Sequence, residues 1–435
     1  MRRTSRLVSV LALVCCAVCL LGTTVTAGDQ DKMPITTKSE EALNHYLQGR
    51  DLFDRLRAQE SREYFQKAAD LDPDFALAHL ALAQVSPTAK VFFEEFEKTR
   101  ALVNRVSEAE RFWILGVEAG AINADPVAQK DYFTRLVNMY PNDERAHNLL
   151  AGFYFGQLDY PKAVVEYEKA TKINPEYSQP YNQMGYAYRF LERYDEAEAA
   201  FKTYIELIPD DPNPYDSYAE LLMKMGRFDE SIENYRKALE INPTFVFSHL
   251  GIASDLCFKN DHTGACEQLQ TMYKNAKDDG QRRNALTAMA VTYVDEGKTD
   301  LALAEIQKRY DLAEAINDAG AMAGDHIFMG NILLEAGRLD DAEQHYDKAL
   351  KTTENSSLAQ AVKDQAWLTH LFNTARVAAA RGNIDKATSM ANDYLKRVEM
   401  AENRNQIRLA HQLVGSIALK SGDFETARGE LLQTN

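Results

Sequence analysis

The sequence has 435 residues, with 49 Lys and Arg against 65 Asp and Glu, so its formal net charge is −16. An acidic balance of this size argues against non-specific nucleic-acid binding, which needs a basic surface to displace counterions. The composition is 45% hydrophobic and 26% charged, as in ordinary globular proteins, and counts of 12 Pro and 21 Gly argue against a turn-rich all-β chain.

Residues 1–27 have the pattern of an export signal peptide. Three arginines precede an apolar run from Leu7 to Leu21 that only Ser9 interrupts. As a helix this run would span about 22 Å, which is short of the ~30 Å hydrocarbon core of a membrane. Small residues then lead to Ala27, so we expect cleavage after Ala27 and a soluble periplasmic or secreted protein. An uncleaved membrane anchor is the alternative.

Removing this leader, which holds three Arg and no acid, would change the net charge from −16 to −19. Anchoring as a lipoprotein is poorly supported by the pattern. Lipidation needs a small residue directly before the acylated cysteine, whereas Val14 precedes Cys15 and Val18 precedes Cys19. Residues 28–40 are interpreted as a linker between the leader and the folded array.

The rest of the chain repeats with a period of 34 residues. Pro141, Pro175, Pro209 and Pro243 follow one another at intervals of 34, and Pro73 lies 68 residues before Pro141. In the reference repeat 178–211, counted from position 1 at Ser178, small residues occupy positions 8 and 20 and aromatic residues positions 11 and 24. We expect the small residues to let two antiparallel helices approach closely and the aromatic rings to fill the space beside them.

The turn between the two helices of each repeat also recurs. Residues 193–197, 226–230 and 337–342 share a basic residue followed by an acidic stretch, in two cases after glycine. Glycine tolerates the left-handed conformation that ends a helix. The Asp that follows is predicted to cap the second helix, with further acids near its positive end.

With this period and these residue positions, the chain resembles the tetratricopeptide-repeat (TPR) family, as an exported bacterial member, over nearly all of residues 42–435. The resemblance implies an all-α fold, a right-handed superhelical solenoid of antiparallel helix pairs. We expect about 10–11 helical hairpins starting near Glu40. Residues 41–282 form the regular array, and residues 283–435 a TPR-like array with longer repeats.

Two stretches depart from the regular pattern. In the unit 76–109, Ser86-Pro87 interrupts the first helix, so we expect a distorted pair with an elongated second helix over 88–105, followed by a helix that opens with a capping box at Ser107 and Glu110. Beyond residue 282, helix-ending glycines are spaced 40 to 45 residues apart, which favours longer helices.

The sequence stops partway through its last helix pair. Either Leu431 and Leu432 are exposed, or the array continues beyond Asn435, which we favour because a solenoid needs a polar cap.

Candidate chemistry is sparse. Cys257 and Cys266 fall on neighbouring helices of one unit, and export to an oxidising compartment makes them candidates for a disulfide. The alternative is two buried thiols; a metal site that also uses His249 and His262 lacks support from any paired CxxC motif. No nucleophile, zinc-protease or phosphate-binding motif occurs, so we predict no enzyme activity, no metal and no cofactor. His147, His249 and His345 are interpreted as packing or surface residues.

The TPR resemblance also implies a binding surface. In this family, positions 2, 5, 9, 12 and 13 of the first helix line a concave groove that takes peptides or partner segments. In this sequence those positions hold Arg145, Asn148, Phe155, Gln179, Asn182, Tyr186, Arg189, Phe190, Asn213, Asp216 and Glu220. The basic clamp that chaperone-binding members use for carboxylates is not reproduced.

We therefore expect a non-catalytic scaffold or assembly factor of the cell envelope that binds a protein or peptide, and neither nucleic acid nor a cofactor. Two alternatives remain at this point. One is a module that binds glycan or peptidoglycan fragments, and the other is the sensor or regulatory part of a larger enzyme or signalling complex. The sequence does not predict an oligomeric state.

Overall fold

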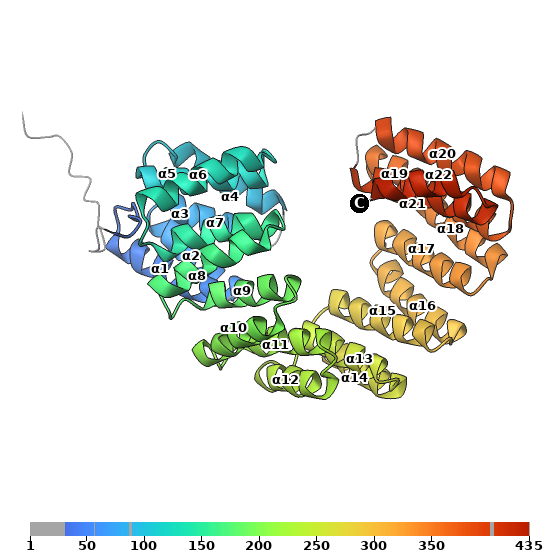
Figure 1. Ribbon diagram of the computed structural model, residues 1–435, viewed down its shortest axis with the longest axis horizontal. Coiled ribbons are helices and arrows are strands. Elements are labelled where there is room, and N and C mark those ends of the chain that lie inside the picture. The colour runs from blue at the N-terminus through green and yellow to red at the C-terminus, as the bar shows by residue number, and fades with distance from the viewer. Residues whose placement is uncertain (1–30, 56, 87–88, 401–403, 435) are drawn as a thin grey trace, which may run out of the picture. The chain divides into compact units, whose positions relative to one another are not determined.

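The computed structural model describes residues 31–434, apart from 56, 87–88 and 401–403. The predicted signal peptide lies outside the described residues. Within them, the chain forms 22 α-helices, one 3₁₀ turn and no β-strand (Figure 1), which confirms the all-α prediction. The chain divides into two compact units, Met1–Leu221 and Leu222–Asn435.

The helices of the first unit are mostly 13 to 15 residues long. They are α1 (Glu40–Asp54), α2 (Ala58–Leu71), α3 (Ala76–Gln84), α4 (Ala89–Leu102), α5 (Glu108–Ala121), α6 (Pro126–Met139), α7 (Glu144–Gly156), α8 (Tyr160–Ile173), α9 (Ser178–Phe190), α10 (Tyr194–Leu207) and α11 (Pro212–Lys224), whose last residues belong to the second unit.

The second unit begins with helices of the same size and continues with longer ones. It contains α12 (Phe228–Ile241), α13 (Val246–Phe258), α14 (His262–Asn275), α15 (Asp279–Asp295), α16 (Thr299–Ala315), α17 (Ala319–Glu335), α18 (Leu339–Glu354), α19 (Gln360–Ala380), α20 (Ile384–Met400), α21 (Arg404–Ser421), α22 (Phe424–Leu431) and the 3₁₀ turn Leu432–Thr434. From α15 to α21 the helices run to 16–21 residues, which confirms that longer helices stretch the period.

Helices pack in sequence order. The two members of a pair pack together, as α1 does with α2 and α17 with α18, and the second helix of a pair packs on the next pair, as α8 does on α9 (Figure 1). The close approach within a pair depends on the small residue at position 8. A Cβ atom on Gly185 would lie 2.7 Å from ring atoms of Phe201, which is fully buried. The predicted role of the small and aromatic positions is therefore confirmed.

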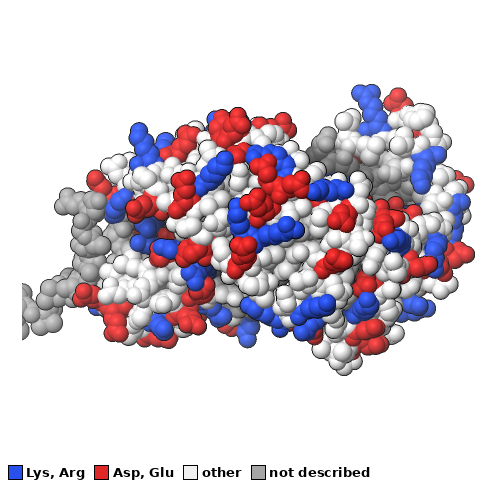
Figure 2. All heavy atoms as spheres, turned by 90° about the horizontal axis from the view of Figure 1, so that it is seen from below, with Lys and Arg blue, Asp and Glu red and all other residues white. Residues whose placement is uncertain are grey.

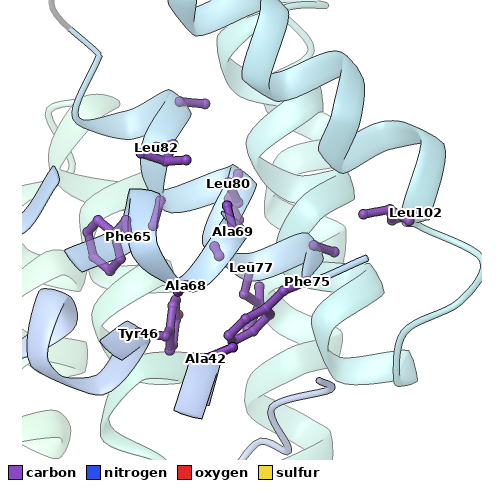
Figure 3. Packing of buried hydrophobic residues seen from close by; sticks show 14 of the residues in the cluster. Ala42, Tyr46, Phe65, Ala68, Ala69, Phe75, Leu77, Leu80, Leu82 and Leu102 are labelled. Carbon is purple, nitrogen blue, oxygen red and sulfur yellow. The ribbon is translucent and has the colours of Figure 1, made fainter. Parts of the chain in front are cut away.

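The core of the first pairs shows the same arrangement. Ala42 and Tyr46 of α1 pack on Phe65 and Ala68 of α2, and Phe75 closes the cluster at the start of α3 (Figure 3). The ring centroids of Tyr46 and Phe75 lie 5.0 Å apart. The cluster shows how the alternation of alanine and aromatic residues in the repeat becomes interdigitated packing.

The turns within pairs confirm one prediction and correct another. Gly226 adopts a φ of 76°, and the glycines that end the later first helices also have positive φ. The predicted Asp cap is wrong at Asp195, Asp229 and Asp340, because α10, α12 and α18 already begin at the residue before each aspartate. These acids lie in the first turn, where the helix dipole still favours them. The N-cap position holds arginine instead, and its side chain pairs with the acid three residues on, as in Arg193–Glu196 at 2.7 Å.

The unit 76–109 also differs from its prediction. The second helix, α4, is not elongated but has 14 residues, whereas the first helix, α3, is cut to nine. The physical reason is Pro87, because the residue before a proline disfavours helical geometry. The capping box is confirmed, since the Ser107 side chain accepts from the Glu110 amide and the Glu110 carboxylate accepts from the Ser107 amide.

No helix among the described residues combines the length and the apolar character needed to cross a membrane.

Candidate interaction surface

Nine of the eleven predicted groove residues separate into two groups in the structure. Arg145, Asn148, Gln179 and Asn182, here called the inner cluster, lie near the N-terminal ends of α7 and α9. The Asn148 side chain donates to the Tyr177 hydroxyl at 3.0 Å and to the side-chain carbonyl of Gln179 at 3.1 Å, so these side chains join α7 to α9. Asn182 is only 3% exposed. The inner cluster is therefore engaged mainly within the chain.

Helix α1 lies close to this inner cluster. The Ser178 hydroxyl donates to the carbonyl of Asp54 at 3.3 Å, although the two residues are 124 positions apart. Burial raises the pKa of Asp54 to about 6, although the Arg145 and Arg50 guanidiniums act in the opposite direction. For Arg145, burial disfavours the charge, but Asp54 and neighbouring groups outweigh it and raise the pKa. The charged C-terminal end of α1 thus lies beside the inner cluster.

The second group, here called the outer cluster, comprises Phe155, Tyr160, Tyr186, Arg189, Phe190 and Glu220. Tyr160 was not predicted, because it begins a second helix. Its ring stacks on Phe190 with centroids 4.7 Å apart, and Phe155 meets both rings edge-on at 5.4 and 6.1 Å. Phe190 remains 49% exposed, so the aromatic group is open to a partner.

Polar contacts join this aromatic group to α11. The Arg189 guanidinium lies over the rings of Tyr186 and Phe190, at 4.9 and 5.1 Å from their centroids, and also pairs with Glu220. The Tyr186 hydroxyl donates to Glu220 at 2.9 Å. Burial, and then the Glu220 charge, raise the pKa of Tyr186, so this phenol stays neutral. The outer cluster combines exposed aromatic surface, one guanidinium and one carboxylate.

Two predicted residues on α11 contribute less. The Asn213 side chain donates to the hydroxyl of Tyr204, a fully buried residue of α10, at 3.0 Å. Its role is therefore packing between repeats. Asp216 contributes negative charge that raises the pKa of Tyr186.

Three buried histidines, His79, His147 and His249, share an arrangement of contacts that the sequence did not predict. Nδ1 of His147 lies 2.6 Å from the Glu166 carboxylate of the paired helix, and its Nε2 lies 3.0 Å from the carbonyl of Pro141. His79 and His249 make the same two kinds of contact, with Glu95 and Pro73 and with Gln268 and Pro243. Burial disfavours the charge of Glu166, but hydrogen bonds from His147 and Lys169 outweigh it and lower the pKa. His147 and His249 are therefore packing residues. Histidine recurs at position 4 of these repeats, and this recurrence is the feature of the sequence that points to a shared role.

Cys257 and Cys266 are free thiols in this structure, each partly buried. The Cys257 sulfur lies 3.7 Å from the Thr292 hydroxyl, and burial raises the pKa of both thiols. Across the described residues, no group of three His, Cys, Asp or Glu is placed to hold a metal ion. His262 instead pairs with Asp295 at 2.9 Å.

Charged residues of both signs are interspersed on the face shown in Figure 2. Many pair along one helix, as Lys202 does with Glu198 at 2.7 Å. On that face, neither sign collects into a continuous stripe.

Comparisons with known proteins give one consistent family description. Models described as tetratricopeptide repeat match residues 46–86, 178–211 and 219–245, and a model described as tetratricopeptide repeat-like domain matches residues 242–367. No curated protein matches the sequence.

Several solved structures are similar in fold. A tetratricopeptide repeat protein from Parabacteroides merdae ATCC 43184 has 16% identity over 60% of this chain and 97% of its own, with a TM-score of 0.43. MamA from Desulfovibrio magneticus RS-1 has 16% identity over 40% of this chain and 99% of its own, with a TM-score of 0.36. YrrB, described as a TPR protein with an unusual peptide-binding site, has 19% identity over 41% of this chain and 91% of its own, with a TM-score of 0.32.

Proposed function

Because the chain is a tetratricopeptide-repeat protein, and such proteins are typically non-catalytic protein-interaction scaffolds, we propose that it binds an extended protein segment through the outer cluster. The observation that carries this proposal is the 49% exposure of Phe190 within a group of rings and charges. Single exposed apolar residues are common on protein surfaces, but aromatic rings that gather at the surface with an Arg beside them are typical of a site that a partner covers.

The chemistry of the outer cluster suits a peptide. Arg189 and Glu220 already pair with each other, and Glu220 also accepts from Tyr186, so the free surface of the outer cluster is the half-exposed Phe190 ring with this charged pair at its border. A glycan would be the other class of ligand for exposed aromatic residues. However, Tyr160 stacks on Phe190 and the Arg189 guanidinium lies over the same ring, so these contacts use the flat surface that a sugar ring would need.

The inner cluster is a less suitable site. The Asn148 amide already bonds to Gln179 and Tyr177, Asn182 is buried, and α1 lies beside the cluster. A ligand there would have to replace existing hydrogen bonds, which yields little net free energy. The proposed surface is therefore narrower than the groove predicted from the repeat positions.

We further propose that the protein acts in the cell envelope after export, as a scaffold or assembly factor. The support is the leader pattern of residues 1–27. Amino-terminal sequencing of the protein from its own cells tests this, since cleavage predicts a mature chain that starts at Gly28. An intact Met1 in the exported fraction, or recovery only from the cytoplasm, would remove the proposal.

The binding proposal is tested by quantitative affinity capture with three forms of the full chain. Phe190→Ala removes the exposed ring, and Phe93→Ala is a matched control, because Phe93 is 51% exposed on α4 and lies outside the outer cluster. We expect the wild type and Phe93→Ala to capture the same partners and Phe190→Ala to lose them. Circular dichroism checks that both variants remain folded. Unchanged capture by Phe190→Ala would reject the outer cluster as the site.

A further inference from the structure

The segment before α1 is docked onto the first unit. Residues 32–38, here called the strap, belong to the predicted linker, but they are not a free connection. They form neither helix nor strand and run past the starts of α7 and α5 and the turn before α3. Thr37 is only 3% exposed.

Three buried acids hold the backbone of the strap. Asp143 accepts from the Met33 amide at 2.8 Å, Glu110 from the Thr36 amide at 2.7 Å, and Asp72 from the Lys38 amide at 2.9 Å. Asp143 and Glu110 are each 1% exposed, and Asp72 is 6% exposed. These three residues are here called the junction acids. Main-chain bonds to fixed carboxylates are the way in which a surface binds an extended peptide independently of most of its side chains.

Asp143 and Glu110 each bond to a helix end as well as to the strap. In Asp143, Oδ1 caps α7 by accepting from the Arg145 and Ala146 amides, while Oδ2 accepts from the strap. In Glu110, Oε2 completes the capping box with Ser107 and also accepts from the Thr36 hydroxyl, while Oε1 accepts from the Thr36 amide. Helix ends orient Asp143 and Glu110, and the Asp74 amide orients Asp72, so the strap binds to carboxylates that other parts of the chain also hold.

Side chains of the strap add specificity. The hydroxyls of Thr36 and Thr37 donate to Glu110 and Asp72 at 2.5 and 2.6 Å. Ile35 packs against the cluster around Tyr46 and Phe75, and Met33 packs against the cluster of Ala109, Leu136 and Ala146.

Both ends of the strap are basic and meet acids. Lys32 pairs with Glu144 at 2.5 Å, and Lys38 pairs with Asp74 at 2.6 Å. Burial disfavours the charge of Glu144, but the bond from Lys32 and the charge of Arg145 outweigh it and lower the pKa. The bound segment thus reads Lys-Met-Pro-Ile-Thr-Thr-Lys, with apolar and hydroxyl groups between two cations.

We propose that the junction acids form a second peptide-docking site, distinct from the outer cluster, in which the strap is an intramolecular occupant. The site fits an extended segment with flanking lysines, apolar anchors and adjacent threonines. Because Ser39 joins the strap directly to α1, its effective concentration at the site is on the order of millimolar, so it excludes a free peptide of equal intrinsic affinity. Release of the strap makes the site available.

The test uses the full chain in three forms: the wild type, Thr36→Val with Thr37→Val, and Thr36→Ser with Thr37→Ser. Valine keeps the shape but removes both hydroxyl donors to carboxylates, whereas serine keeps them. Hydrogen exchange at the amides of Met33, Thr36 and Lys38 reports strap release. We expect protection in the wild type and serine form, and on the order of 100-fold faster exchange in the valine form.

A fluorescein-labelled peptide of residues 31–39 then tests the vacated site. The valine form is expected to bind it saturably, at least ~10-fold more tightly than the wild type does. The same peptide with both threonines changed to valine serves as the control ligand. Exchange at free-peptide rates in the wild type would overturn the proposal, as would unchanged exchange in the valine form or failure of that form to bind the peptide. If the valine form does not fold, Lys32→Ala with Lys38→Ala is judged by the same outcomes.

Discussion

Asp255 provides a quantitative prediction about stability in the second unit. This α13 residue has no exposed surface, and within the described part of the chain neither carboxylate oxygen has a hydrogen bond of normal geometry. Burial raises its pKa from 3.8 to about 6, and the nearby Ser231 hydroxyl and Lys259 only partly offset that effect. The folded unit therefore prefers the protonated acid.

The sign of the pH dependence follows from the raised pKa. The folded state binds the proton more tightly than the unfolded chain does, so this residue favours folding below pH 3.8 and loses that contribution as the pH rises through about 6. A change from 3.8 to about 6 corresponds to about 3 kcal/mol. We predict that Asp255→Asn matches the wild type at pH 4 and is more stable at pH 7.5 by up to about 3 kcal/mol.

The assay can be confined to the second unit. The chain has two tryptophans, Trp113 in the first unit and Trp367 in the second. In a Trp113→Phe background, urea unfolding followed by tryptophan fluorescence reports the unit that contains Asp255. The control is Asp300→Asn, which removes an acid that is 89% exposed and is expected to change stability by less than about 1 kcal/mol. Parallel pH profiles for Asp255→Asn and the wild type would refute the reasoning.

Three further predictions concern packing, acid stability and the thiols. Gly185→Ala places a Cβ atom 2.7 Å from the Phe201 ring and should lower the free energy of unfolding by about 1–3 kcal/mol in urea titrations, whereas an unchanged midpoint would show that the ring can move. Burial and then the neighbouring His326 lower the pKa of His345 to about 4, so His345→Gln should reduce the loss of stability that occurs as the pH falls from 6.5 towards 4, and an unaltered acid limb of the stability profile would contradict this. A thiol titration of denatured, non-reduced protein from its own cells distinguishes the free thiols of this structure from the disulfide predicted from the sequence: two free thiols would exclude the Cys257–Cys266 disulfide, and none would support it.

The features predicted correctly from the sequence are those that depend on a short stretch of chain. The 34-residue period, the close contact of position 8 with position 24 and the glycines that end first helices all act within one helix pair. Gly185 and Phe201 are 16 residues apart, and their relation recurs in other repeats. Local repetition of this kind is visible without knowing how distant repeats lie.

The errors have local causes as well. The prediction that Asp195 and its equivalents cap these helices rests on the preference for Asp at N-cap positions. The helices already begin at the residue before the aspartate, so arginine occupies the N-cap, two positions before the predicted one. In the unit 76–109, the proline shortened the helix before it and did not lengthen the helix after it.

What could not be predicted depends on contacts between distant parts of the chain. The strap meets Asp143, which lies 110 residues beyond Met33, and Ser178 meets Asp54 across 124 residues. Neither contact leaves a periodic signal in the sequence. The approach of α1 to the inner cluster is one such contact.

Site-specific photo-crosslinking tests the proposed binding surface most directly. A photoreactive phenylalanine analogue is introduced at position 190 or, as the control, at position 93 of the full chain, and the cells are irradiated. If the outer cluster binds a protein segment, position 190 will give a discrete covalent adduct with another protein, and position 93 will not. Irradiation that gives no adduct at position 190, or the same adduct at both positions, would contradict a binding site at the outer cluster.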